Sequence, residues 1–257
     1  MPHTLQFRTT DAPTPEISTP NGSTPRAQVR YTGAVLPWQT LAETTAPDGA
    51  RLELRRRGDE FLIRAGGYDL MSSRDDASAR ALATVGCEVL PQRARPRVLI
   101  GGLGMGYSVA AACERLPADA DIEVAELVPA VVEWNRGPLA ELAGRPLDDP
   151  RVVVVVGDVA ARIEAARDHY DAILLDVDNG PDPLAHDHNA RLYGVRGLRA
   201  AHRALRAGGV HAVWSYSDAG GFARSLERAG FGASVHRVDN RGRDRGRTHV
   251  IWRGVRL

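Results

Sequence analysis

The segment from Arg97 to Glu126 constrains the fold of this chain more than any other part of the sequence. An apolar run leads into a glycine-rich turn, an alanine-rich helical stretch follows, and a second apolar run ends at Glu126. The turn contains Gly101, Gly102, Gly104 and Gly106. Glycines allow positive φ angles and let backbone N–H groups approach a ligand closely. An acid about 20 residues further on is where such folds bind the two hydroxyls of a ribose, so the segment predicts a nucleoside-binding unit.

All 33 basic side chains are arginines, because the 257-residue sequence contains no lysine. This composition excludes lysine Schiff-base chemistry, pyridoxal phosphate enzymes included, and it excludes a Walker phosphate loop, which requires a lysine. The formal net charge of +1 gives no electrostatic reason to expect a nucleic acid as partner. Cys87 and Cys113 stand in apolar helical contexts, so we expect two small buried hydrophobes that suit a reducing cytoplasm.

Composition divides the chain into segments that we expect to be structurally distinct. Residues 1–30 are rich in Thr, Pro, Ser and Asn and are predicted to be a disordered leader without the apolar stretch of a secretory signal. Residues 31–95 are predicted to form a small β module and a linking helix, with a hairpin of strands 51–55 and 60–64 and a helix over 75–90. No apolar run is long enough to span a membrane, so we expect a cytoplasmic protein.

Strands and helices alternate over the predicted catalytic domain, residues 96–257, which indicates a mostly parallel sheet covered by helices on both faces. The expected strands are 97–101, 122–126, 151–156, 171–176, 208–215, 233–239 and 247–253, and the expected helices are 106–116, 129–142, 159–167, 192–206 and 219–229. Gly208-Gly209 is predicted to end the fourth of these helices. The last two strands are predicted to form a hairpin, which makes the final strand antiparallel to the others. The predicted fold class is α/β, with a doubly wound, Rossmann-like, seven-stranded sheet.

Acidic residues stand at the carboxyl ends of three expected strands, where ligands of open α/β sheets bind. They are Glu126, Asp158, which follows Gly157, and Asp176. Strand ends of one sheet converge on one crevice, so we expect these acids to line one pocket. An Asp158 side chain in that pocket can accept a hydrogen bond from an adenine amino group. The alternative for each acid is a helix N-cap, which Asp158 could also form for the helix 159–167.

Several of these motifs resemble those of spermidine synthases, the polyamine aminopropyltransferases. The resemblance covers roughly residues 34–257, and it rests on 98–106, 125–132, Gly157-Asp158 and 170–176, with Arg74-Asp75-Asp76 where the family has Arg-Asp-Glu. It implies the class I S-adenosylmethionine-dependent methyltransferase fold. It also implies that Glu126 binds the ribose and Asp158 the adenine of the donor, while Asp176 faces the substrate amine.

The sequence also departs from the family pattern, and the departures favour a different reaction. Gly104 replaces an aspartate that holds the aminopropyl end of the family's donor, so by charge alone this turn suits intact S-adenosylmethionine, which carries a carboxylate. The second acid after strand four, Asp178, comes one position early. Residues 77–83 lack the tyrosine and histidine that surround the family's amine tunnel.

We therefore expect methyl transfer to an amine or hydroxyl of a small molecule, with Asp176 orienting or deprotonating the acceptor and Asp178 assisting. Aminopropyl transfer from decarboxylated S-adenosylmethionine is the first alternative. A non-catalytic nucleoside-binding protein and a nicotinamide-dependent oxidoreductase are further alternatives. The expected assembly is a homodimer, with no nucleic acid or membrane partner.

The segment after strand four contains His186-Asp187-His188. A metal cluster with Asp176 and Asp178 is one interpretation of it. A polar loop that caps the helix 192–206 is the other, and we expect the loop and no metal, because no fixed ligand spacing supports a site. The loop follows the tip of the Asp176 strand, so it is also a candidate lid over the pocket.

Overall fold

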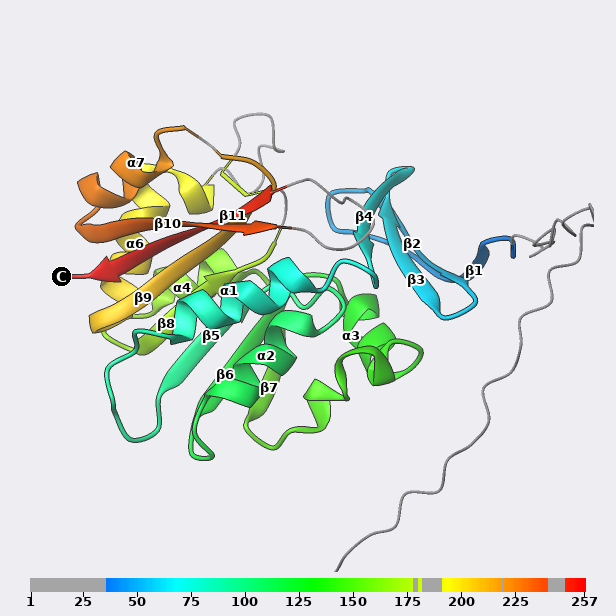
Figure 1. The fold of residues 1–257 in the computed structure, drawn as a ribbon, viewed down its shortest axis with the longest axis horizontal. Coiled ribbons are helices and arrows are strands. Elements are labelled where there is room, and N and C mark those ends of the chain that lie inside the picture. The colour runs from blue at the N-terminus through cyan, green and yellow to red at the C-terminus, as the bar shows by residue number, and fades with distance from the viewer. Residues whose placement is uncertain (1–35, 178–179, 182–190, 219, 240–247) are drawn as a thin grey trace, which may run out of the picture. The chain divides into compact units, whose positions relative to one another are not determined.

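The structure, a computed structural model, describes residues 36–177, 180–181, 191–218, 220–239 and 248–257. Residues from Leu36 to the end of the chain form one unit that contains two sheets (Figure 1). The predicted leader, residues 1–30, lies outside the described residues, as do Asp178 and the segment with His186 and His188.

The first sheet has four antiparallel strands in the order β1-β2-β3-β4. Its strands are β1 (Gln39–Thr45), β2 (Arg51–Arg57), β3 (Glu60–Ala65) and β4 (Tyr68–Ser72). The predicted hairpin is confirmed, since Arg57 pairs with Glu60 across a turn that begins at Gly58, where φ is +60°. Leu52 and Leu54 alternate with exposed or half-buried residues along β2, as expected for a strand with one buried face.

The second sheet has seven strands in the order β10-β11-β9-β8-β5-β6-β7. Its strands are β5 (Arg97–Gly101), β6 (Asp121–Glu126), β7 (Val152–Val156), β8 (Tyr170–Leu175), β9 (Leu205–Ser215), β10 (Phe231–Asp239) and β11 (Thr248–Arg256). Strands β5 to β9 pair in parallel, and β11 runs antiparallel to both β9 and β10. The predicted α/β fold class is therefore confirmed, terminal hairpin included.

Helices cover both faces of this sheet (Figure 1). On one face lie α1 (Ala77–Cys87), α2 (Tyr107–Arg115) and α3 (Pro129–Arg136), and on the other α4 (Val159–Ala165), α6 (Val195–Ala204) and α7 (Phe222–Arg228). Side chains alternate accordingly: Val98 and Ile100 of β5 join the core under α1 and α2, while Leu99 joins the core under α4 and α6. In the described part of the chain, no helix is long and apolar enough to cross a membrane.

Two predicted helix ends are wrong for local reasons. The helix expected over 129–142 ends at Arg136, because Gly137 leaves helical geometry at φ −111° and ψ −110°, and only a short 3₁₀ turn, Ala140–Ala143, follows. Gly208-Gly209 does not end a helix: α6 ends at Ala204, and both glycines lie inside β9. Gly208 has φ +74°, and the β8–β9 register is irregular beside it. This glycine therefore allows the irregular backbone conformation within β9.

A fully buried carboxylate connects the amino-terminal ends of the sheet. Asp171 of β8 is 0% exposed and accepts hydrogen bonds from Arg93 Nη1 at 2.9 Å and from Arg206 Nη1 at 2.9 Å. It also accepts one from the backbone N–H of Arg97 at 2.8 Å. Arg97 begins β5 and Arg206 lies in β9, so one charge joins three neighbouring strands.

Asp171→Asn should lower the free energy of unfolding by about 2–3 kcal/mol, because two arginines lose a buried, hydrogen-bonded anion. Urea unfolding followed by far-ultraviolet circular dichroism measures this change. Asp121→Asn is the matched control, since the half-exposed Asp121 also pairs with arginines, Arg95 at 3.4 Å and Arg97 at 3.5 Å. It should cost at most about 1 kcal/mol. Equal small losses in both variants would contradict the role given to Asp171.

Candidate active site

The glycine turn after β5 is fixed between the ends of two neighbouring strands. Gly102 has φ +88° and donates its N–H to the carbonyl of Ala125 in β6 at 2.9 Å. On the other side, the N–H of Asp176 donates to the carbonyl of Gly101 at 2.8 Å. A Cβ atom on Gly102 would lie 2.2 Å from the carbonyl oxygen of Asp176, so only glycine fits this position.

The carboxylate of Glu126 connects this turn to the start of α3. Oε2 accepts the N–H of Leu103 at 2.9 Å, and Oε1 accepts the N–H of Val128 at 2.8 Å. The side chain is buried, and burial raises the pKa of Glu126 above its usual value, although backbone N–H donors, including those of Val128 and Leu103, oppose that rise. Backbone N–H groups from the glycine turn and from the connection into α3 therefore fix this carboxylate at the end of β6.

Asp158 forms the N-cap that the sequence offered as an alternative. Its Oδ1 accepts the N–H of Ala160 at 2.8 Å in the first turn of α4. Its Oδ2 forms an ion pair with Arg191, a partner that the sequence analysis missed. The preceding Gly157 donates its N–H to the carbonyl of Glu126 at 2.8 Å, which places Asp158 beside the end of β6.

Asp176 is the first residue after β8, and its side chain is held by a residue of α2. The hydroxyl of Ser108 donates to Asp176 Oδ2 at 2.8 Å. Ser108 is 3% exposed, and it lies in the first turn of α2, directly after the glycine turn. Sequence reasoning missed Ser108, although a serine within an otherwise apolar helix start was a usable signal. One oxygen of Asp176 is therefore oriented by the protein.

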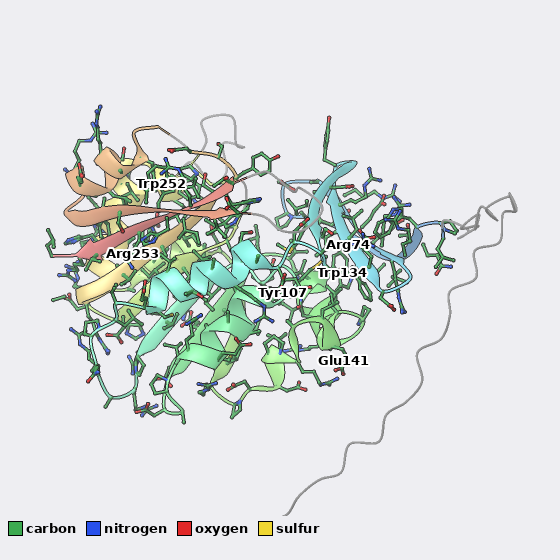
Figure 2. All side chains as sticks on the ribbon, viewed as in Figure 1. Arg74, Tyr107, Trp134, Glu141, Trp252 and Arg253 are labelled. Carbon is green, nitrogen blue, oxygen red and sulfur yellow. The ribbon has the colours of Figure 1, made fainter. Side chains whose placement is uncertain are left out.

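The end of β4 closes the site next to the glycine turn. The Met71 side chain lies so near Gly104 that a Cβ atom there would stand 2.7 Å from Met71 Cε and 2.9 Å from its sulfur. Ser73, two residues on, accepts the hydroxyl of Tyr107 through its carbonyl at 3.1 Å. Figure 2 labels Tyr107 and Arg74, which mark where the four-stranded sheet meets α2. The space beside Gly104 thus holds an apolar thioether.

Among the described residues, no group of three or more His, Cys, Asp and Glu side chains is arranged to hold a metal ion. The structure brings the glycine turn, Glu126, Gly157-Asp158 and Asp176 to the carboxyl ends of β5, β6, β7 and β8. The roles of these residues toward a donor or an acceptor remain predictions.

Gly102→Ala should destabilise the fold by about 2 kcal/mol or more, because a Cβ would collide with backbone and the residue would keep a positive φ. Gly220→Ala is the control, since nothing lies within 4 Å of the Cβ position there. Thermal unfolding of both variants measures the difference. A Gly102→Ala protein as stable as Gly220→Ala would show that the turn can move away from the end of β8.

Comparisons with known proteins agree with this arrangement. No family model matches the chain. The chain is 29% identical over 192 residues to the polyamine aminopropyltransferase of Mycobacterium tuberculosis strain H37Rv, which covers 71% of this chain and 35% of that protein. It is 36% identical over 115 residues to putrescine N-methyltransferase 2 of Nicotiana attenuata, which covers 44% of this chain and 29% of that protein. The chain therefore spans about a third of the length of the curated relatives that it matches.

Solved structures show the same fold. A spermidine synthase in complex with the transition-state analogue AdoDATO matches with a TM-score of 0.69 at 18% identity, over 85% of this chain and 73% of that one. The spermidine synthase from Thermotoga maritima matches with a TM-score of 0.68 at 17% identity, over the same shares of the two chains. The predicted resemblance is confirmed: the chain has polyamine aminopropyltransferase homologues and spermidine synthase structural neighbours, together with a relationship to putrescine N-methyltransferases.

Proposed function

We propose that this chain is an S-adenosylmethionine-dependent methyltransferase that acts on an amine or hydroxyl of a small molecule. The observation that carries the proposal is the position of Met71 against Gly104, on a glycine turn held by Glu126 and adjoining Asp176. The similarity to putrescine N-methyltransferases supports methyl transfer on this type of scaffold.

The residues at the strand ends fit the nucleoside half of such a donor. Glu126 would accept hydrogen bonds from the two ribose hydroxyls, since it lies at the end of β6, where such folds bind a ribose. Asp158 would accept from the adenine amino group, and its Oδ2 must then be shared with Arg191 or released by it. The glycine turn after β5 lies between Glu126 at the end of β6 and Asp176 after β8.

The methionine end of the donor would lie beside Gly104 and Met71. A thioether there adds no negative charge, so the amino acid carboxylate of intact S-adenosylmethionine meets no repulsion from this side. Decarboxylated S-adenosylmethionine and aminopropyl transfer are the second candidate. The similarity to polyamine aminopropyltransferases favours that candidate, because it extends over 71% of this chain.

Asp176 would act on the acceptor. When bound, the donor supplies a methyl carbon whose bond to the sulfonium breaks, with the electron pair kept by sulfur, as the acceptor's lone pair attacks. Ser108 orients Asp176 by donating its hydroxyl to Oδ2, and the carboxylate would accept the N–H or O–H of the acceptor. That contact would align the nucleophile and allow the carboxylate to accept its proton. A protein that only binds nucleosides would not need an oriented acid at this strand tip.

We also propose a cytoplasmic location. Cys87 and Cys113 are free thiols, and burial raises both pKa values to about 12. Thiols of this kind suit a reducing compartment.

Glu126→Gln should weaken binding of S-adenosylhomocysteine by about 10- to 100-fold, because the ribose loses charge-assisted hydrogen bonds. Isothermal titration calorimetry measures the affinity. Glu123→Gln is the matched control on the same strand, where Glu123 pairs with Arg162 at 2.6 Å, and it should leave the affinity unchanged. Unchanged affinity in both variants would place the ribose elsewhere.

The pH dependence of S-adenosylhomocysteine binding provides a second test of the role of Glu126. Burial raises the pKa of this carboxyl, and protonation removes acceptor capacity. The affinity of the wild-type protein should therefore fall as the pH drops through a range above that of an ordinary glutamate. Glu126→Gln should lose this dependence.

Asp176→Asn should lower turnover by about 10²–10⁴-fold while donor affinity changes by no more than a few-fold. The amide keeps the size of the side chain but cannot take the proton. Asp178→Asn should lower turnover less than Asp176→Asn does, and Asp69→Asn, an exposed acid on β4 that pairs with Arg64, is the neutral control. Rates with putrescine and with 2-phenylethylamine as acceptors provide the measurement. Full turnover in Asp176→Asn would move the chemistry to the loop of His186 and His188.

A further inference from the structure

One side of α3 faces the glycine turn and has a buried asparagine on it. Val128, Val131 and Asn135 follow one another at spacings of three and four residues, so they share this side of the helix. Val128 and Val131 belong to the core, and Asn135 is 4% exposed. A buried amide on an apolar side of a helix requires hydrogen-bond partners. The partners of Asn135 therefore show what it does.

The Asn135 amide connects α3 to the glycine turn. Its Nδ2 donates to the carbonyl of Gly104 at 2.8 Å and to the carbonyl of Val131 at 2.9 Å, so both N–H groups of the amide are used. Two carbonyls require a donor, which fixes the orientation of the amide. Its oxygen lies next to Gly106, where a Cβ atom would stand 3.0 Å from Oδ1. The side chain therefore extends from the middle of the turn to the start of α2.

The turn depends on such contacts because its own backbone does not fix its shape. Gly102, Gly104 and Gly106 all have positive φ, and glycine exchanges easily between conformations. Backbone hydrogen bonds hold the two ends of the turn, through the N–H of Gly102 and the N–H of Gly106. Asn135 holds its middle, through the carbonyl of Gly104. The hydrogen bond from α3 therefore orients the peptide group that follows Gly104.

We propose that Asn135 is a positioning residue for the amino acid end of the donor. The inference rests on the proposed function, which places that end beside Gly104 and Met71. While Asn135 holds it, the Gly104 carbonyl oxygen is directed at α3 and its partial negative charge is paired with an N–H. Without this hydrogen bond the peptide would be free to rotate, and its oxygen would repel the donor's carboxylate whenever it turned toward the ligand. Asn135 thus acts through the turn and does not touch the ligand.

The test compares two ligands that share the nucleoside and differ at the amino acid end, S-adenosylhomocysteine and methylthioadenosine. Isothermal titration of the full chain measures both affinities. Asn135→Ser keeps a hydroxyl that can bond to Val131 but ends one atom short of the Nδ2 that reaches Gly104. It should weaken S-adenosylhomocysteine by about tenfold and methylthioadenosine by no more than about threefold. Asn135→Asp has the same size but presents oxygens to two carbonyls, so it should weaken S-adenosylhomocysteine further.

The difference between the two ligands separates positioning from a purely structural role. Methylthioadenosine binding shows that a variant is folded, and should Asn135→Asp fail to fold, the serine variant carries the comparison. Glu133→Gln is the control on the same helix, where the exposed Glu133 pairs with Arg136 at 3.0 Å, and it should change neither affinity.

Equal losses for the two ligands in Asn135→Ser, or unchanged binding of both, would overturn the inference and leave the proposed function standing. Binding of neither ligand by the wild-type protein would contradict the proposed function, and this inference with it.

Discussion

The site depends on one interaction, the hydrogen bond by which the Glu126 carboxylate holds the turn that follows β5. Its two oxygens accept the N–H groups of Leu103 and Val128. The end of β6 therefore fixes both the turn between β5 and α2 and the connection from β6 into α3. The turn can then approach β8 so closely that Gly102 admits no side chain. A buried anion is costly, and the raised pKa of Glu126 is a sign of that cost. We propose that the charge is kept at this position because the hydroxyl groups of a ribose bind there.

We assign different parts of the proposed site to the two faces of the seven-stranded sheet. Asp158 caps α4 on one face, on the side that we assign to adenine. On the other face, Ser108 of α2 orients Asp176, and Met71 comes from β4. The first sheet therefore borders the space that we assign to the methionine end of the donor. Ser73 links it to α2, since its hydroxyl accepts the N–H of Phe61 at 2.9 Å while its carbonyl accepts from Tyr107 at 3.1 Å.

Local patterns in the sequence were enough to predict the fold. Alternation in β2, apolar runs such as Val152–Val156 and the glycine turn each depend on residues close together in the chain, and the structure contains all three. The errors at Gly137 and Gly208 arose because a glycine in a sequence does not reveal which backbone conformation it adopts.

Contacts between residues far apart in the chain could not be predicted from local sequence patterns. Ser108 and Asp176 are separated by 68 positions, and no spacing rule connects them. The Arg191–Asp158 pair, the approach of Met71 to Gly104 and the hydrogen bond from Asn135 to Gly104 likewise depend on how separate elements pack together. These four contacts carry most of the chemistry proposed here, which is why the acids could be chosen from the sequence and their partners could not.

The choice of donor tests the account most directly. Isothermal titration of the wild-type protein with S-adenosylmethionine and with its decarboxylated form compares the two ligands at the Gly104–Met71 surface. The account predicts tighter binding of intact S-adenosylmethionine, because no acid stands beside its carboxylate there. Binding of the decarboxylated form alone would contradict it and would identify aminopropyl transfer as the reaction to pursue.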